Sequence, residues 1–567
     1  MPLLRRAASA LFACLALALP GCTDDPLSAS LPSGASPEAV ISPQATPSAP
    51  ITWEKCPLRT GGRGTRAECA NITVPLDWND PGGRRVTYFV KRLPGTSSGA
   101  HKQLWLLQGG PGGAGDTLET LADEVVSKAP AFDVYVPDHR GTGRSAYLGC
   151  PNAMAKRHFD PRACAAEAQA EWGASGFAAF TTTNAARDLG YAIERTRAEG
   201  QEVHVYGVSY GTYLAQRYLQ IFPTQPTAVT LDGVCQAGLC SYMKIGYWFD
   251  RIGKKYLGEC AANASCAEKL GPNPIATVKE ALAIADAGTC PGIAGVDAAA
   301  LRQLFSYFIA SFDLRVLIPS TAYRIVRCSP DDAAALEHMT AALSRAPGGP
   351  FAPAGELSSE VLGLHIAFSE LEEDPPALSA DLEALFDDPV FTTFDATVRD
   401  VWESWPRYPH DEWVGKYPSS NVPILMLNGT LDPQTPQEFA EQIAPHYAMP
   451  AQSLVLLPRA AHCTLTQSPT STWPGTETCG MNVWRQFLAA PAAALDTSCR
   501  DRILTHDFAG SPSIAQYFYG EPSLWGGATT SSAAPLDDDL SGVQVEWERA
   551  IRAVGPRLDL AHRRRAD

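Results

Sequence analysis

The chain has 567 residues, of which 45% are hydrophobic and 19% are charged, with a formal net charge of -16. This length and apolar content are enough for one large core with an insertion or for two domains, which excludes a disordered chain. The acidic balance would repel phosphate backbones, and the longest basic run is 563–565, so we expect no nucleic-acid partner.

The first 22 residues have the pattern of an export signal. Arg5 and Arg6 precede an apolar run that is too short to remain as a membrane span. The run ends in "LPGC", 19–22, which resembles a bacterial lipobox and predicts a lipid anchor on Cys22. The alternative is an ordinary signal peptide that contains a cysteine. We therefore expect an exported, extracytoplasmic protein that is either anchored to a membrane through Cys22 or secreted.

The fifteen cysteines fit an exported chain. Without Cys14 in the signal and Cys22 at the anchor, thirteen remain, so at least one cannot pair within the chain. There is no Cys-x-x-Cys pair, which favours disulfides over zinc. The sequence does not fix the connectivity. The short-range candidates are Cys56–Cys69, Cys150–Cys164, Cys235–Cys240 and Cys260–Cys266.

After the signal, a tether rich in Ser, Pro and Ala at 23–50 lacks the apolar residues needed to fold. From Ile51, alternating β-branched and aromatic residues predict antiparallel strands. Apolar runs then alternate with helical patterns, which predicts an α/β fold with a mostly parallel sheet and helices on both faces. The strand-like runs are 103–110, 132–141, 203–207 and 228–233.

Between about 234 and 400 the strand signal fades and helical patterns dominate. Strand-like runs resume at 422–429 and 453–458, so we predict that a helical cap interrupts the sheet. The expected segments are a signal peptide (1–22), a tether (23–50), a first core part (51–235), a cap (236–400), a second core part (401–510) and a C-terminal extension (511–567).

The run "VHVYGVSYGTYLAQRYLQIFP", 203–223, passes from a strand pattern through Gly207, Ser209 and Gly211 into a helical pattern. Small residues two positions either side of a serine allow the sharp strand-to-helix turn that exposes a nucleophilic hydroxyl. The motif alone is weak, but the strand before it and the helix after it supply the required context. We therefore predict that Ser209 is a nucleophile.

A serine hydroxyl needs a general base and a group that orients that base. His462 follows the strand-like run 453–458, and Asp432 follows the run 422–429. Both residues therefore belong to the sheet edge where the serine lies, in the order Ser, Asp, His. Asp232 is the reserve acid, and His410 and His446 are weaker candidates for the base because neither directly follows a strand.

The negative charge that develops during acyl transfer needs backbone donors. We expect one from Tyr210, directly after the nucleophile, and a second from Gly109 or Gly110 in "QGGPGG", 108–113. A phosphate-binding loop is the alternative for this run, but the run lacks the lysine of a P-loop and the spacing of a dinucleotide fingerprint.

Four linked motifs, "QGGPGG", "DHRGTGRS", the extended serine elbow and "NGTLDPQTP" followed by "AAHC", resemble the α/β-hydrolase family of secreted tripeptidyl aminopeptidases and prolyl iminopeptidases. The elbow is closer to the tripeptidyl branch, and the resemblance covers roughly residues 50 to 500. Two positions depart from the pattern: Gln108 stands where the family often has His or Asn, and Cys463 stands where many members have Gly.

The resemblance implies an α/β-hydrolase fold with an inserted helical cap and the release of short peptides or single residues from free N-termini. It also implies that acidic cap residues bind the α-ammonium group of the substrate, and Glu370 in "IAFSELEEDPP" is the matching candidate. No metal or organic cofactor is implied. We predict a serine aminopeptidase; the alternatives are an esterase or amide hydrolase of the same fold, and a non-catalytic binding lipoprotein.

Overall fold

The structure is a computed structural model that describes residues 50–154, 160–345, 357–377, 379–393, 395–471 and 477–527. The expected signal, the anchor residue Cys22 and the tether before Pro50 lie outside these ranges. Among the described residues, no helix combines the length and the apolar character needed to cross a membrane.

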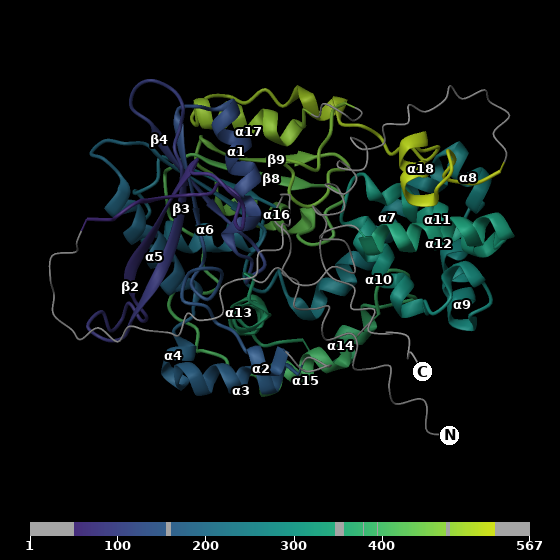
Figure 1. The fold of residues 1–567 in the computed structure, drawn as a ribbon, viewed down its shortest axis with the longest axis horizontal. Helices are drawn as coiled ribbons and strands as arrows, with labels where there is room; N and C mark the ends of the chain where they lie inside the picture. Colours follow the sequence, from purple (N-terminus) through teal and green to yellow (C-terminus); the bar gives the residue numbers. More distant parts are fainter. Residues whose placement is uncertain are drawn as a thin grey trace.

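A nine-stranded sheet in the order β1-β2-β3-β5-β4-β6-β7-β8-β9 organises the larger part of the molecule (Figure 1). The first three strands pair antiparallel, and the strands from β5 to β9 in this order are parallel. Every strand-like run of the sequence is confirmed. The strands are β1 (Glu54–Cys56), β2 (Ala67–Pro75), β3 (Arg85–Leu93), β4 (Lys102–Leu107), β5 (Phe132–Pro137), β6 (Val203–Val208), β7 (Ala228–Asp232), β8 (Ile424–Gly429) and β9 (Gln452–Leu457).

Helices cover both faces of the parallel strands, as the alternating pattern predicted. Successive residues of a strand point to opposite faces, so Trp105 packs in one apolar cluster with α5 and α6, while Leu104 packs in another with α1 and α17. Trp105 and Leu104, which are neighbours on β4, are both fully buried. The covering helices are α1 (Glu119–Lys128), α5 (Thr182–Thr196), α6 (Tyr210–Ile221), α16 (Gln437–Ile443) and α17 (Cys479–Ala489).

Most of the inserted segment forms a separate helical lobe beside the sheet, on the right in Figure 1. The lobe has its own apolar core, to which the C-terminal helix α18 contributes Phe518 and Tyr519. The beginning of the C-terminal extension is therefore part of the lobe. The lobe helices are α7 (Ile245–Ala262), α8 (Ala264–Leu270), α9 (Pro274–Ala287), α10 (Ala298–Ile309), α11 (Leu317–Arg327), α12 (Pro330–Arg345) and α18 (Pro512–Tyr519).

The rest of the insertion packs on the sheet domain instead of the lobe. Leu362, Ile366 and Phe368 belong to the same apolar cluster as the sheet and α6, and α13 and α15 contact α3 below the sheet in Figure 1. The expected single cap is therefore two parts with separate cores. The insertion contributes α13 (Glu360–Ile366), α14 (Ser379–Ala384) and α15 (Ala396–Ser404). The first core part contributes α2 (Pro151–Met154), α3 (Pro161–Trp172) and α4 (Ala174–Ala178).

Six disulfides cross-link the described residues, and they include all four short-range candidates. The other two pairs are Cys290–Cys328 in the lobe and Cys479–Cys499 in the second core part. Buried Cys463, next to the expected base, takes part in none of the six. This agrees with the expectation from the odd number of cysteines, thirteen, that at least one of them forms no disulfide within the chain.

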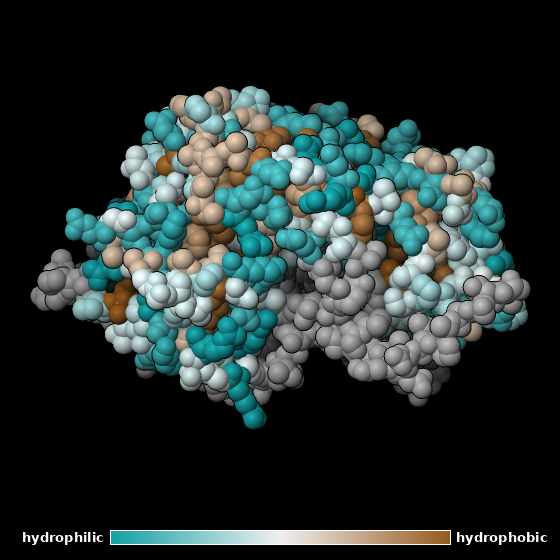
Figure 2. Space-filling model, turned by 90° about the horizontal axis from the view of Figure 1, so that it is seen from above, coloured by the Kyte–Doolittle hydropathy of each residue, from teal (hydrophilic) through white to brown (hydrophobic). Residues whose placement is uncertain are grey.

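The surface is mainly polar on the face that Figure 2 shows. Hydrophilic residues predominate among the described residues, and hydrophobic ones occur in small separate groups. Small scattered apolar groups of this kind are normal on a folded protein. This face therefore gives no indication of a large hydrophobic interface.

Candidate active site

The backbone at Ser209 forms the tight strand-to-helix turn that the sequence predicted. Ser209 has φ 58° and ψ -128°, a conformation that non-glycine residues rarely adopt. The flanking glycines are required by space: a Cβ on Gly207 would lie 2.2 Å from the carbonyl oxygen of Gly211, and a Cβ on Gly211 would lie 2.3 Å from that of Leu107. The serine therefore sits between the carboxyl end of β6 and the first turn of α6.

The expected acid and base are in direct contact. His462 Nδ1 lies 2.7 Å from Asp432 Oδ2, and both side chains are almost fully buried. The other carboxylate oxygen accepts backbone N–H groups of Gln434 at 2.8 Å and Thr435 at 3.0 Å. Because Asp432 accepts only, Nδ1 carries the proton and donates it, which leaves Nε2 as the basic nitrogen.

Thr435 contacts both the expected acid and the expected base, which sequence reasoning did not predict. Its hydroxyl donates to Asp432 Oδ2 at 2.8 Å and lies 3.1 Å from His462 Nδ1. The signal was available: in "DPQT" an aspartate is followed three residues later by a threonine, a spacing typical of turns in which the carboxylate accepts nearby backbone N–H groups. Thr435 therefore helps to fix the carboxylate that orients the imidazole.

The environment of His462 suits a general base. Burial alone would lower its pKa, but the charge and hydrogen bond of Asp432, with a smaller effect of Asp232, raise the pKa above the ordinary histidine value. Nε2 is buried, and no described residue forms a hydrogen bond with it. A buried, unpaired nitrogen is available to take a proton from a nucleophile, although Ser209 and His462 form no direct hydrogen bond among those described.

Ser209 and His462, the expected nucleophile and base, both lie against the end of β7. The backbone N–H of Ser209 donates to the carbonyl oxygen of Asp232 at 2.9 Å. A Cβ on the next residue, Gly233, would lie 2.9 Å from His462 Cε1. The structure thus brings the three predicted residues, from loops after β6, β8 and β9, to one edge of the sheet, where parallel α/β sheets place their ligands.

Asp232, the reserve acid, has a different task. Its carboxylate accepts the backbone N–H of Thr464 at 3.0 Å and the hydroxyl of Tyr206 at 2.9 Å. Burial raises the pKa of Asp232, against the hydrogen bonds that it accepts. Asp232 therefore stabilises the loop that follows His462, whereas Asp432 binds the imidazole of His462.

The two weaker candidate bases lie elsewhere. His410 is hydrogen-bonded through Nε2 to the carbonyl oxygen of Ser369 at 2.6 Å. His446 stacks on Tyr417 with the ring centres 3.6 Å apart. Neither pairs with Asp432, so the structure favours His462 as the base.

The glycine-rich loop after β4 passes directly against the nucleophile. A Cβ on Gly109 would lie 2.7 Å from Ser209 Cβ, and Gly110 has φ 115°, which favours glycine. The backbone N–H of Tyr210 lies in the first turn of α6, where helices leave N–H groups without an intrahelical partner. The N–H of Gly109 donates to Gln108 Oε1 at 2.6 Å, so this side chain must turn away before Gly109 can bind an oxyanion.

A second motif is hydrogen-bonded to the segment that follows this loop. In "DHRGTGRS", Asp138 accepts the backbone N–H of Gly115 at 3.0 Å through Oδ1. Its Oδ2 accepts the backbone N–H and the Nε–H of Arg144, at 2.8 and 3.0 Å. The two motifs are therefore one structural unit, in which a buried carboxylate holds the loop of the expected oxyanion donors.

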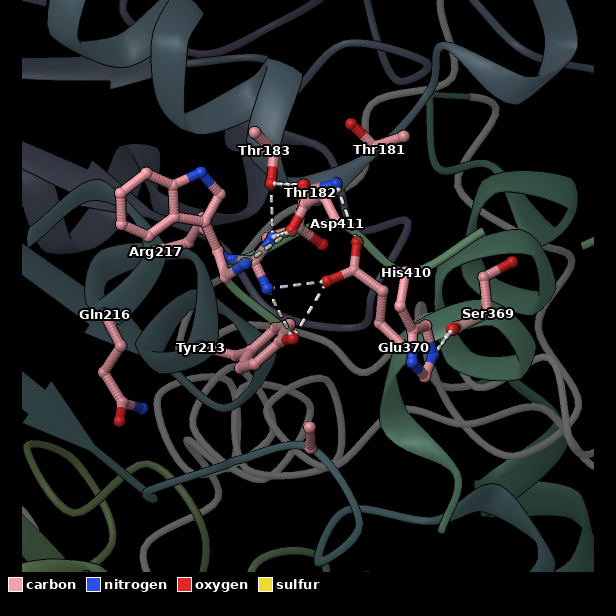
Figure 3. Close-up of polar contacts among 12 residues, drawn as sticks. Thr181, Thr182, Thr183, Tyr213, Gln216, Arg217, Ser369, Glu370, His410 and Asp411 are labelled. Atoms are coloured by element: carbon pink, nitrogen blue, oxygen red, sulfur yellow. Dashed lines mark hydrogen bonds and ion pairs between the residues drawn. The ribbon is translucent and has the colours of Figure 1, made fainter. Parts of the chain in front are cut away.

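Glu370 lies in a buried polar network, in a helical turn (Ala367–Leu371) that follows α13 (Figure 3). One carboxylate oxygen accepts from the backbone of Thr182 at 3.1 Å and from the Tyr408 hydroxyl at 2.6 Å. The other accepts from Tyr213 and Arg217, each at 2.9 Å. Four donors thus occupy the carboxylate, and Arg217 compensates its charge. All four of these hydrogen bonds come from within the protein, and the role of Glu370 as the ammonium ligand stays a prediction.

A pocket of about 590 Å³ lies next to this network. Its walls include Trp402 and Trp405, and three carboxylates line it, those of Glu372, Glu373 and Asp374. Such a combination of aromatic walls and negative charge suits a cation.

Glu372 is the most buried of the three acids. It accepts from the Ser241 hydroxyl and from the backbone of Tyr242, the latter at 2.9 Å. Burial raises the pKa of Glu372 to about 7, against these hydrogen bonds. The hydroxyl of the same Tyr242 donates to the carbonyl oxygen of Gly110 at 3.3 Å. A single tyrosine therefore connects this acid to the oxyanion loop.

Comparisons with known proteins agree with this geometry. The α/β-hydrolase fold profile matches residues 104–266, and the profile described as TAP-like protein matches 388–499. The tripeptidyl aminopeptidase of Streptomyces coelicolor is 29% identical over 219 residues, which are 35% of this chain and 40% of that protein. Serine protease Hip1 of Mycobacterium tuberculosis is 25% identical over 265 residues, 41% of this chain and 48% of that protein.

Carboxylesterase B of Mycobacterium tuberculosis is 31% identical over 116 residues, which are 18% of this chain and 21% of that protein. The chain spans less than half the length of each of these curated relatives. The fold, the linked motifs and both profiles nevertheless agree. The chain is therefore a member of the α/β-hydrolase family, on the branch that holds the tripeptidyl aminopeptidases.

Proposed function

We propose that the chain is an exported serine exopeptidase that hydrolyses peptide bonds near free N-termini. Ser209 attacks the scissile carbonyl, His462 takes the proton through Nε2 and returns it to the leaving amine, and Asp432 stabilises the imidazolium. Water then hydrolyses the acyl-enzyme by the same route. The backbone N–H of Tyr210 and one from Gly109 or Gly110 stabilise the oxyanion, at about 3 kcal/mol for each donor.

The acidic pocket, which Tyr242 connects through Glu372 to the oxyanion loop, is the observation that carries the exopeptidase assignment. A substrate whose carbonyl lies against Gly110 can extend its N-terminal part along Tyr242 toward Glu372. The ammonium group then meets a carboxylate that burial has made responsive to a cation, because pairing with a positive charge removes the penalty that raises its pKa. We propose that Glu372 contacts the ammonium group directly. Glu370 stabilises the pocket by its hydrogen bond with Tyr408, which lines it.

The exported location rests on two features of the chain. The N-terminal pattern up to Cys22 is that of a lipoprotein signal, and the six disulfides fit an oxidising compartment. We propose that the mature protein begins at acylated Cys22 and is held at a membrane. Mass spectrometry of the N-terminal peptide tests this: a diacylated or triacylated Cys22 supports the anchor, and an unmodified residue at another cleavage site contradicts it.

An esterase of the same fold is the second candidate, favoured by the similarity to carboxylesterase B. The two functions share the catalytic residues and differ in the pocket, because the core sets the acyl chemistry and the inserted parts set the substrate. A non-catalytic binding lipoprotein is the third, and the buried, oriented Asp432–His462 pair argues against it.

Matched fluorogenic substrates decide between these functions. The set contains amides of one residue, of proline and of a tripeptide, each with a free and an acetylated N-terminus, together with a short-chain ester. The proposal predicts that a free N-terminus is required and that Ser209→Ala abolishes turnover. Cleavage of the ester alone would select the esterase, and equal cleavage of free and acetylated peptides would exclude the ammonium site.

A further inference from the structure

The acid and the base of this site stand on two loops, which are joined directly by the N–H of Leu431 to the carbonyl oxygen of Ala460 at 3.1 Å and by the N–H of Arg459 to the hydroxyl of Thr430 at 2.8 Å. Asp432 follows β8 and His462 follows β9, and the two side chains meet at 2.7 Å. Positioning errors of about 1 Å in catalytic groups can lower rates about 100-fold. The contacts that fix the loops relative to each other are therefore important for the reaction.

One side chain from the helical lobe reaches both loops. Arg315, in a short helical turn (Leu314–Val316) before α11, donates from Nη2 to the carbonyl oxygen of Leu431 at 2.5 Å and from Nη1 to that of Arg459 at 2.7 Å. Leu431 directly precedes Asp432, and Arg459 stands three residues before His462. The guanidinium thus bridges the two catalytic loops.

The same guanidinium is fixed from the lobe side. Its Nε donates to the carbonyl oxygen of Ile309 at the end of α10, at 2.8 Å, and the side chain of Arg315 is fully buried. The ion pairs of the described residues do not include Arg315, and burial lowers its pKa to about 10, although the charges of Glu259, Asp432 and Asp313 raise it. The group therefore remains a cation at neutral pH. Its contacts are three backbone carbonyls on three segments.

Two further contacts join the lobe to the Asp432 loop. Leu431 is fully buried within the apolar core of the lobe. Lys255 on α7 donates to the carbonyl oxygen of Thr430 at 2.8 Å. The residues that lead to the catalytic acid are therefore packed against the inserted lobe as well as against the sheet.

We propose that Arg315 is a positioning residue, through which the inserted lobe sets the geometry of the Asp432–His462 pair. A planar guanidinium with donors in a fixed fork holds two carbonyls at a fixed separation, whereas the compact ammonium group of lysine cannot. The lobe then contributes to the geometry of the catalytic pair through this side chain. This inference rests on the proposed serine-hydrolase function.

The test compares Arg315→Lys with Arg324→Lys. Both arginines are fully buried in the lobe, but Arg324 donates to the carbonyl oxygens of Ser523 and Leu524, far along the chain from the catalytic loops. Arg315→Lys keeps the positive charge but loses the planar pair of donors that binds the two carbonyl oxygens. We expect kcat to fall about 10- to 100-fold per fluorophosphonate-titrated site with KM unchanged. Arg324→Lys is expected to keep kcat within about twofold at a similar loss of stability.

The pH profile separates positioning from a merely structural role. Asp432 raises the pKa of His462, so a loosened pair must shift the acid limb of kcat/KM to lower pH in Arg315→Lys and leave it in place in Arg324→Lys. If wild-type protein neither reacts with the probe nor cleaves any substrate, the proposed function fails. If wild type is active and Arg315→Lys behaves like Arg324→Lys in kcat and in pH profile, only the role of Arg315 is overturned.

Neighbouring lysines on α7 keep the proposal testable if Arg315→Lys does not fold. Lys255 contacts the Asp432 loop, whereas Lys254 contacts Asp387 and Asp250 within the inserted segment. Lys255 is exposed, so its replacement by methionine should leave the fold intact. We expect Lys255→Met to lower kcat about two- to fivefold relative to Lys254→Met, and equal kcat values in the two variants would overturn the proposal.

Discussion

Removal of the charge on Glu370 distinguishes a structural acid from a substrate ligand. In Glu370→Gln the amide oxygen can still accept from Thr182 and Tyr408, but the two bonds at the other oxygen, from Tyr213 and Arg217, are lost. Both charged partners are 1% exposed, so Arg217 would lose its buried counter-ion and keep only the partly exposed Asp411, whose Oδ1 lies 3.8 Å from Nη1. Breaking a buried pair in this way costs about 3 to 5 kcal/mol.

Urea unfolding followed by tryptophan fluorescence measures this loss. We expect Glu370→Gln to lose about 3 kcal/mol and Arg217→Met to lose up to about 5 kcal/mol, because the second change leaves a carboxylate with only neutral donors. The double variant should lose less than the sum of the two. A loss below about 1 kcal/mol in Glu370→Gln, together with a tenfold higher KM for substrates with a free N-terminus, would show that Glu370 is a ligand and that this reasoning is wrong.

Three further predictions concern the site. The raised pKa of His462 places the acid limb of kcat/KM above about pH 6.5, with activity lost as the pH falls through it; Asp432→Asn should lower kcat about 10⁴-fold and move the limb to lower pH. Glu372 is neutral below its pKa of about 7, so KM for free N-termini should rise as the pH falls below 7 and become independent of pH in Glu372→Gln. Gly109→Ala should lower kcat at least about 100-fold, since its Cβ would lie 2.7 Å from that of Ser209; an unchanged rate in a stopped assay would contradict the placement of this loop.

The sequence was most informative where local pattern and chemistry coincide. The runs that became β6 and β8 are strands buried on both faces, β9 is a partly buried edge strand, and the residues after these three strands carry the serine, the acid and the base. The glycines around Ser209 are required by backbone contacts within a few residues. Such short-range constraints can be read from one sequence.

Long-range pairings could not be predicted in this way. Arg217 lies on α6 and Glu370 lies 153 residues later, so nothing in either segment reveals that they pair. The division of the insertion has the same origin, since α13 to α15 and α7 to α12 both read as helical segments and only tertiary packing assigns them to different cores. Arg315 shows the limit most clearly, because its partners are backbone carbonyls, which leave no signal in the sequence.

The most direct test of the central claim is the site of reaction with a fluorophosphonate probe. Mature protein and the Ser209→Ala and His462→Ala variants are treated with the probe, digested and analysed by mass spectrometry. If the Asp432–His462 pair activates Ser209, wild-type protein carries one adduct on Ser209, His462→Ala reacts at least about 1,000-fold more slowly, and Ser209→Ala carries none. An adduct on another residue, or equal labelling of wild type and His462→Ala, would contradict the account.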